Sequence, residues 1–274
     1  MMQPKSRRKV FRVLAAVTMI YLLAALAVFF FQRNLLYFPD IAPLPVAIEI
    51  AKRAGFEVWN NPSGEFMGWK KVSTATNGTR NRILITHGNA GSAIDRADYA
   101  GYINQAEPCD VYILEYPGYG PRPGSPTQQS LIRVADEAMA LLEKEGSVYV
   151  IGESLGTGVA AYIAGTYPTN VTALLLIAPY HNLGDVAQSH IPIFPARYML
   201  LDKFPSAEYL RNYHGRLAVL LAGQDEVVPN KFGKKLFEAY SGPKKVWEIP
   251  RAGHNDLPNV PVTWWIELIA FWKS

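Results

Sequence analysis

From residue 82 to the C-terminus, short and mostly apolar runs alternate with longer segments in which apolar residues recur every three or four positions. The short runs are typical of strands buried on both faces, and the longer segments are typical of helices that pack one face on a core. This alternation predicts an α/β fold with a mostly parallel central sheet and helices on both faces. The predicted strands are 82–86, 111–116, 148–151, 173–178, 217–222 and 245–249, and the predicted helices are 93–106, 128–145, 155–166, 231–240 and 262–272.

The segment before residue 82 has a different pattern. Residues 56–59 and 66–72 have strand patterns and are joined by a turn at Pro62-Ser63-Gly64, which predicts an antiparallel start to the sheet. A short helical pattern at 45–54 precedes them in a proline-punctuated stretch. We therefore expect a linker over 33–54 and one folded domain over 55–274, a length at which α/β proteins commonly form a single domain.

The N-terminal segment contains no charged residue between Arg12 and Arg33, a stretch of 20 residues. A helix of this length, rising 1.5 Å per residue, is about 30 Å long and matches the hydrocarbon thickness of a bilayer. Thr18 and Tyr21 are the polar interruptions before Phe31. The pattern predicts one transmembrane signal-anchor helix over 13–32, preceded by a basic N-terminus over 1–12.

Charge gives this anchor an orientation. The chain carries a net charge of +4, but five of its 27 basic residues lie within the first 12 residues, which leaves 22 basic against 23 acidic residues in the rest. The positive-inside rule then places the N-terminus in the cytoplasm and the folded domain on the periplasmic or extracytoplasmic side. The nearly neutral remainder argues against a nucleic-acid partner.

Two other interpretations of the N-terminal segment stay open. Ala25-Leu26-Ala27 fits the cleavage site of a secretory signal peptide, and a buried core helix would show a similar apolar run. The continuation of the run through Phe31 favours an uncleaved anchor. Cys109 is the only cysteine, so neither an internal disulfide nor a thiolate metal cluster is expected.

The pentapeptide Gly152-Glu153-Ser154-Leu155-Gly156 lies between the predicted strand 148–151 and the predicted helix 155–166. A strand, a sharp turn with Ser at its apex and a helix form the nucleophile elbow of serine hydrolases. The glycines are needed because side chains two residues either side of the strained Ser would collide with their surroundings. Ser154 is therefore the candidate nucleophile.

A Ser hydroxyl needs a base and an acid, which follow the Ser in that type of enzyme in the order acid, then His. Of five histidines, His254 is the one in a loop between the last predicted strand and the last predicted helix. Asp225 follows the predicted strand 217–222 directly and is the candidate acid, with its neighbour Glu226 as the alternative. These positions predict a triad of Ser154, Asp225 and His254.

The oxyanion hole is predicted from the loop after strand 82–86, His87-Gly88-Asn89-Ala90-Gly91-Ser92. Its small residues let backbone N–H groups approach a substrate carbonyl, and we assign the two donors to the N–H groups of Asn89 and Leu155. A phosphate-binding loop is the alternative, but the segment lacks the Lys and spacing of a Walker motif and the glycine pattern of a dinucleotide site. His87 is expected to hold the loop in place.

These motifs, with Tyr116-Pro117-Gly118-Tyr119-Gly120 between them, occur together and in order, and over roughly 32–274 the chain resembles the α/β-hydrolase superfamily. It is most similar to small serine hydrolases tethered by one N-terminal helix that precedes a Leu-Leu-Tyr-Phe-Pro stretch. The resemblance implies an α/β-hydrolase fold with Ser154 as nucleophile, Asp225 as acid, His254 as base and Asn89 and Leu155 as oxyanion donors. It implies no substrate. Pro121 to Gly124 depart from the usual pattern, where relatives carry a Ser, and this leaves the selectivity of the pocket wall open.

Residues 179–214 fit no single element, and their middle is apolar at 191–195 and 198–201. Insertions at the carboxyl ends of strands overlie the ligand crevice of open α/β sheets. The segment is therefore either a small lid over an apolar acyl pocket or an ordinary crossover helix packed on the sheet.

The sequence as a whole predicts a membrane-tethered serine hydrolase that cleaves carboxylic esters, lipid esters and thioesters included, through an acyl-enzyme. No metal or organic cofactor is expected, and the partners are a membrane and a small acyl substrate. Two alternatives stay open: a serine peptidase or amidase of the same fold, and an inactive tethered protein that only binds its ligand.

Overall fold

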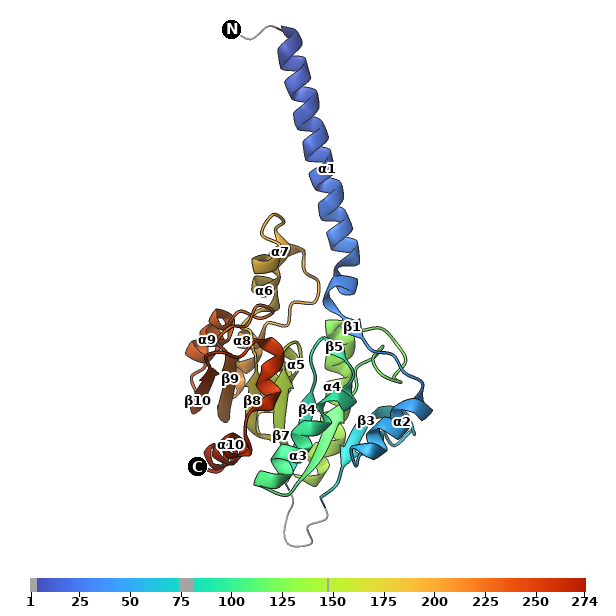
Figure 1. Cartoon of the computed structure of the whole chain (residues 1–274), viewed down its shortest axis with the longest axis vertical. Helices are drawn as coiled ribbons and strands as arrows, with labels where there is room; N and C mark the ends of the chain where they lie inside the picture. Colours follow the sequence, from blue (N-terminus) through green and yellow to red (C-terminus); the bar gives the residue numbers. More distant parts are fainter. Residues whose placement is uncertain (1–3, 74–80, 147) are drawn as a thin grey trace.

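A computed structural model describes residues 4–73, 81–146 and 148–274 of the chain (Figure 1). Its described residues contain an eight-stranded sheet in the order β10-β9-β8-β7-β4-β6-β3-β2. The strands are β2 (Glu57–Asn60), β3 (Phe66–Lys71), β4 (Asn81–Thr86), β6 (Cys109–Leu114), β7 (Val148–Glu153), β8 (Val171–Ile177), β9 (Arg216–Ala222) and β10 (Lys244–Ile249). The strands from β10 to β6 pair in parallel, and β3 and β2 pair antiparallel at one edge. The predicted α/β-hydrolase fold, with its mostly parallel sheet, is confirmed.

The helices cover both faces of this sheet. Neighbouring strand residues face opposite ways, so Leu84 joins the core under one set of helices while Ile83 and Ile85 join the core under the other. One core contains α4 (Gln128–Leu142), α5 (Gly156–Thr166) and α9 (Asn230–Ala239); the other contains α2 (Leu44–Arg53), α3 (Ala97–Ala106) and α10 (Val262–Lys273). Because both faces are covered, the central strands are nearly continuous apolar runs.

The element boundaries differ from the predicted ones by at most four residues. The helix predicted at 93–106 opens as a 3₁₀ turn, η1 (Ala93–Arg96), before α3 begins. The helix predicted at 128–145 ends as α4 at Leu142 and continues as a 3₁₀ turn, η2 (Glu143–Glu145). Strand β6 begins at Cys109, two residues before the predicted start, and leaves Glu115 and Tyr116 to the turn that follows.

Helix α1 (Pro4–Leu36) extends away from the folded body, and only its C-terminal part lies against it (Figure 1). Residues Arg8–Leu36 are long and apolar enough to cross a membrane. The segment predicted as a linker, 33–54, contains the last turn of α1, helix α2 and a short strand, β1 (Phe38–Pro39). Strand β1 pairs in parallel with β5 (Ala90–Gly91), so the end of α1 is joined to the loop after β4.

Residues 179–214 divide into two parts. Helices α6 (Leu183–His190) and α7 (Ala196–Met199) lie on the side of the body where α1 ends (Figure 1). Helix α8 (Ser206–Tyr209) and the 3₁₀ turn η3 (Leu210–Asn212) return to the body, where the backbone of Tyr209 packs against Gly165 of α5. We call residues 183–201 the cap.

Two helical glycines test this packing. A Cβ at Gly165 would overlap the Tyr209 carbonyl, whereas a Cβ at Gly101 of α3 meets open space. We predict that Gly165→Ala lowers the free energy of unfolding by about 1–3 kcal/mol through overpacking, and that Gly101→Ala raises it by about 0.5–1 kcal/mol through helix propensity. Urea unfolding of the full chain in detergent micelles measures both values. Equal effects of the two substitutions would contradict the packing of α8 on α5.

Candidate active site

Ser154 stands at the turn between β7 and α5 with a φ of 51°, in the left-handed region that residues other than glycine rarely adopt. The two glycines around it have no room for a side chain. A Cβ at Gly152 would lie 2.7 Å from the Ala160 Cβ, and one at Gly156 would overlap the backbone carbonyls of Thr86 and His87. The strained turn is therefore held from both sides by close backbone packing, as the sequence pattern predicts for an elbow.

The structure brings the three predicted triad residues together at the carboxyl end of the sheet. Asp225 follows β9, and His254 opens a 3₁₀ turn, η4 (His254–Asn259), that follows β10. The Nε2 atom of His254 lies 3.0 Å from Ser154 Oγ, and its Nδ1 atom lies 2.7 Å from Asp225 Oδ2. Each of these distances is a hydrogen-bond distance, so a proton can pass from Ser154 to an imidazole that Asp225 orients.

The other oxygen of Asp225 is also occupied. The Oδ1 atom accepts the backbone N–H groups of Val227 and Val228 at 2.9 and 2.7 Å, so the carboxylate is fixed by its own loop while Oδ2 faces His254. Asp225 is buried, whereas Glu226, the alternative acid, is exposed. The geometry therefore favours Asp225 over Glu226.

The two predicted oxyanion donors, Asn89 and Leu155, line the same cavity as Ser154. Among the residues that the structure describes, neither backbone N–H has a hydrogen-bond acceptor, so both are available to a substrate oxygen. The Asn89 carbonyl accepts the Phe38 N–H at 2.8 Å and the Tyr119 hydroxyl at 2.7 Å, and the Asn89 side chain donates to the Leu36 carbonyl at 2.8 Å. The loop is thus positioned by the end of α1 and by the Tyr-Gly turn.

His87 supports this loop from beneath. The ring is fully buried, with Nδ1 2.9 Å from the Gly88 carbonyl and Nε2 3.3 Å from a carboxylate oxygen of Glu115. The ring also packs against Tyr116 with centroids 4.0 Å apart. His87 lies outside the Ser154, His254 and Asp225 group.

Glu153 forms a partly buried ion pair that the sequence pattern does not reveal. Arg96 donates to both carboxylate oxygens, at 2.8 and 3.1 Å, and the Tyr99 hydroxyl donates at 2.7 Å. Burial alone would raise the pKa of the Glu153 carboxyl, but the charge of Arg96 and these hydrogen bonds outweigh burial and lower it. Arg96 also lies 3.4 Å from the Ala90 carbonyl, so it links the elbow to the loop that carries Asn89.

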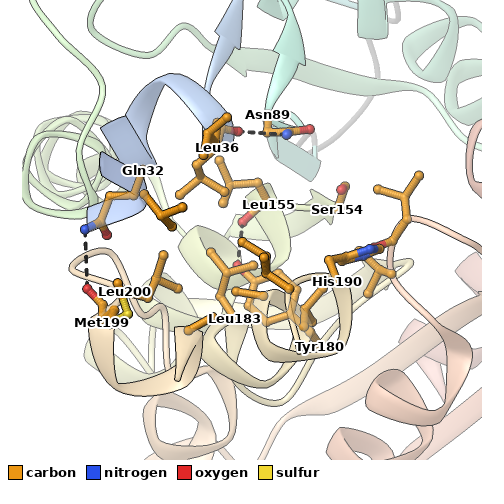
Figure 2. Close-up of a pocket in the computed structure, with 18 of the residues that line it drawn as sticks. Gln32, Leu36, Asn89, Ser154, Leu155, Tyr180, Leu183, His190, Met199 and Leu200 are labelled. Atoms are coloured by element: carbon orange, nitrogen blue, oxygen red, sulfur yellow. Dashed lines mark hydrogen bonds between the residues drawn. The ribbon is translucent and has the colours of Figure 1, made fainter. Parts of the chain in front are cut away.

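A cavity of about 300 Å³ opens in front of Ser154 (Figure 2). Its lining is mostly apolar and comes from the cap, from the loop after Asp225 and from the last turns of α1. The volume lies at the lower end of the range for small-molecule sites. Among the described residues, no cluster of three or more His, Cys, Asp or Glu side chains could hold a metal ion.

The comparisons with known proteins agree with this architecture. The family model for the alpha/beta hydrolase fold matches residues 81–205. Over 253 residues the chain is 32% identical to the uncharacterized protein Rv2307c of Mycobacterium tuberculosis, with 89% of each chain covered. It is 29% identical over 199 residues to the lysophosphatidylserine lipase ABHD12 of Rattus norvegicus, with 65% of this chain and 50% of that one covered.

One solved structure extends the comparison to three dimensions. Est1E from Butyrivibrio proteoclasticus, with ferulic acid bound, matches with a TM-score of 0.62 at 15% identity, covering 76% of this chain and 96% of that chain. At this identity the likeness concerns the fold.

The ion pair beneath the elbow generates a stability prediction. Arg96→Met leaves the partly buried Glu153 carboxylate without its charged partner, which we expect to lower the free energy of unfolding by about 1–3 kcal/mol at neutral pH. Because folding lowers the pKa of Glu153, the stability that the pair provides is complete above the ordinary carboxylate pKa of about 4.3 and is lost as the pH falls through the lowered value.

Urea unfolding between pH 7 and pH 3 measures this effect. The double variant Arg96→Met/Glu153→Gln serves as the control, since it removes both charges and is expected to recover much of the loss. An Arg96→Met variant as stable as the unsubstituted chain at pH 7 would contradict a stabilising role for this ion pair.

Proposed function

Because this chain belongs to the α/β-hydrolase superfamily, we propose that it is a membrane-anchored serine hydrolase that cleaves carboxylic esters. The observation that carries the proposal is the hydrogen-bonded series from Asp225 through His254 to Ser154 on the floor of an apolar cavity. The proposed reaction is acyl transfer to Ser154 followed by hydrolysis of the acyl-enzyme.

In the first step, the Ser154 hydroxyl attacks the ester carbonyl while His254 Nε2 takes its proton. The 3.0 Å separation of these atoms supports direct transfer. Asp225 keeps Nδ1 protonated, holds the ring in position and stabilises the imidazolium that forms. Its own position is secured by the amides of Val227 and Val228.

The negative charge that develops on the carbonyl oxygen is received by the N–H groups of Asn89 and Leu155. Such a preorganised donor contributes about 3–4 kcal/mol to transition-state stabilisation. In this proposal the Asn89 amide is aimed correctly because three hydrogen bonds fix the rest of that residue.

The remaining steps reuse the same groups. Protonated His254 gives its proton to the leaving alcohol oxygen as the tetrahedral intermediate collapses to the acyl-enzyme. His254 then takes a proton from a water molecule that attacks the acyl carbonyl, and it returns that proton to Ser154 as the acid product leaves. These steps use side chains and backbone amides alone.

The lining of the cavity favours an ester with an apolar acyl group. None of the described residues that line the cavity is an Asp, Glu, Lys or Arg, so they offer no carboxylate to the amine of a peptide substrate. The name of the relative ABHD12, a lysophosphatidylserine lipase, supports a lipid ester, although this chain spans only half of that protein. The cap contributes the largest single share of the apolar lining, which supports the lid interpretation for the first part of residues 179–214.

Helix α1 is proposed to anchor the enzyme by one membrane span with the N-terminus in the cytoplasm. The charge asymmetry around the apolar stretch supports this orientation. The catalytic body would then lie on the extracytoplasmic face, in contact with the membrane through the base of α1.

Labelling by a fluorophosphonate probe tests the triad. We predict that the unsubstituted chain is labelled and that Ser154→Ala is not. Asp225→Asn is expected to lower kcat for p-nitrophenyl butyrate by about 10⁴-fold, since the imidazole loses its orientation. Glu226→Gln, an exposed neighbour on the same loop, is the matched control and should hydrolyse this ester at the unsubstituted rate. If Glu226→Gln instead abolished hydrolysis and Asp225→Asn did not, the assignment of Asp225 as the acid would be wrong.

A reporter fused after Ser274 tests the orientation. We predict that alkaline phosphatase, which requires an oxidising compartment, is active in this fusion. β-Galactosidase, which is active only in the cytoplasm, is expected to be inactive when fused at the same position. The reverse pattern would place the catalytic body in the cytoplasm and refute the proposed topology.

A further inference from the structure

One face of α1 is part of the cavity wall. Val28, Phe29, Gln32 and Leu36 line the cavity that holds Ser154. Successive spacings of one, three and four residues place these side chains on one side of the helix, along its last turns. The opposite side is open: the side chain of Phe30 is 69% exposed. A helix that served only as a tether would have no need of such a face.

Val28 and Phe29 belong to the same charge-free stretch that gives α1 its membrane-spanning length. The first charge after them is Arg33, whose guanidinium pairs with Asp202 at 3.0 Å. If Arg33 marks the level of the membrane surface, then the cavity wall reaches into the hydrocarbon. The site would then not lie wholly above the membrane in an aqueous space.

The cap extends even further along α1. We call residues 191–195, Ile-Pro-Ile-Phe-Pro, the cap tip. The Tyr21 hydroxyl donates to the Ile193 carbonyl at 3.1 Å, and the Tyr21 ring lies 5.3 Å from the Phe194 ring. Tyr21 precedes Gln32 by 11 residues, which is about 16 Å along a helix axis. The cap tip thus stands beside the middle of the apolar stretch.

The surface of the cap tip suits a lipid environment. The tip carries no charge, and the exposed fractions are 69% for Ile193 and 79% for Tyr198 just beyond it. Large apolar side chains exposed together on a protein surface commonly mark a contact with a partner or a membrane. The nearest cap charge, Arg197, pairs with Asp185 in the first turn of α6.

The backbone of the cap tip is also suited to lipid, in which unpaired polar groups are costly. Two of its five residues are prolines, which have no N–H to satisfy. The Ile193 carbonyl accepts the Tyr21 hydroxyl, and the Phe194 carbonyl accepts the Ala196 N–H and the Gln188 side chain. The polar hydroxyl of Tyr21 within the apolar stretch of α1 is thereby explained, since it donates a hydrogen bond to the Ile193 carbonyl of the cap.

Side-chain contacts fix α1 and the cap to one another at the base. Gln32 is buried and donates to the Met199 carbonyl (Figure 2). It also accepts the Leu201 N–H at 2.7 Å. The Asp202 carboxylate accepts hydrogen bonds from the Arg33 guanidinium and, at 3.1 Å, from the Tyr37 hydroxyl. Burial and this carboxylate both raise the pKa of Tyr37, so the hydroxyl remains a donor. The depth of the cap tip therefore follows the depth of the anchor.

We propose that the cap tip is embedded in the same leaflet as the C-terminal half of α1, and that the cavity between them opens directly to the lipid. The occupant would be the hydrocarbon chain of a membrane lipid, lying between the Phe29 face of α1 and the cap. The substrate then reaches Ser154 without leaving the bilayer. This inference rests on the proposed function for the ester chemistry and on the proposed anchor for the depth.

Fluorophores at single introduced cysteines measure the depth. The full chain is reconstituted in phosphatidylcholine vesicles containing lipids with a spin label on the acyl chain. Cys109 is buried and does not compete for labelling. We expect nitrobenzoxadiazole groups at Ile193→Cys and Tyr198→Cys to be quenched by these lipids, as is one at Phe30→Cys on the outer face of α1. A group at Ser63→Cys, in the exposed turn between β2 and β3, should show no quenching.

The controls separate the possible failures. Quenching at position 30 with none at positions 193 and 198 would overturn the embedded cap tip while leaving the anchor intact. An absence of quenching at position 30 as well would refute both the anchor and the inference. Neither measurement depends on hydrolysis, so the proposed enzymatic function is not involved in this result.

Chain-length selectivity tests the role of α1 as a cavity wall. Phe29→Trp enlarges a lining side chain, whereas Phe30→Trp makes the same change on the outer face. We expect Phe29→Trp to lower the ratio of kcat/KM for p-nitrophenyl dodecanoate to that for the acetate by tenfold or more. Phe30→Trp should leave this ratio unchanged. An unchanged ratio in Phe29→Trp would overturn the wall assignment, and hydrolysis of neither ester by the unsubstituted chain would refute the proposed function instead.

Discussion

The close approach of the elbow to the strand beside it is the constraint on which the candidate site depends. Gly156 fits only because it has no side chain where the carbonyls of Thr86 and His87 pass. The same approach brings the turn at Ser154 next to the loop that carries Asn89. The nucleophile and one candidate oxyanion donor are therefore set by a single backbone contact between the first residue of α5 and the end of β4, which pairs with β7 at the centre of the sheet.

Charged and polar groups secure this contact from several sides. Arg96 and Tyr99 hold Glu153 beneath the elbow, and the amides of Val227 and Val228 hold Asp225 beside His254. In each case a carboxylate largely removed from solvent is stabilised by several donors at once, which is the condition under which such a charge is tolerable. Asp225, which contacts His254, and Glu153, which lies below Ser154, thus have separate sets of hydrogen-bond donors.

The sequence predicts much of this arrangement because local patterns carry it. The α/β alternation marks the strands, and each candidate triad residue follows the end of a strand. The partners that the sequence did not reveal depend on contacts between distant segments. Strand β1 is two residues long and contains Pro39, so it gives no strand signal, and Arg96 looks like an ordinary surface charge until Glu153 is placed against it. The position of the cap tip along α1 depends on a contact between Tyr21 and Ile193, which are more than 170 residues apart in the sequence.

The two faces of α1 are subject to different demands. A substitution on the outer side, at Phe30 for example, has only to remain apolar, whereas one at Phe29 also alters the shape of the cavity. Among enzymes built in this way, the anchor would not drift freely in sequence as a simple tether does. Its inner positions would vary together with the cap as substrates change. Part of the substrate specificity would then be determined by residues of a segment that is usually treated only as a membrane span.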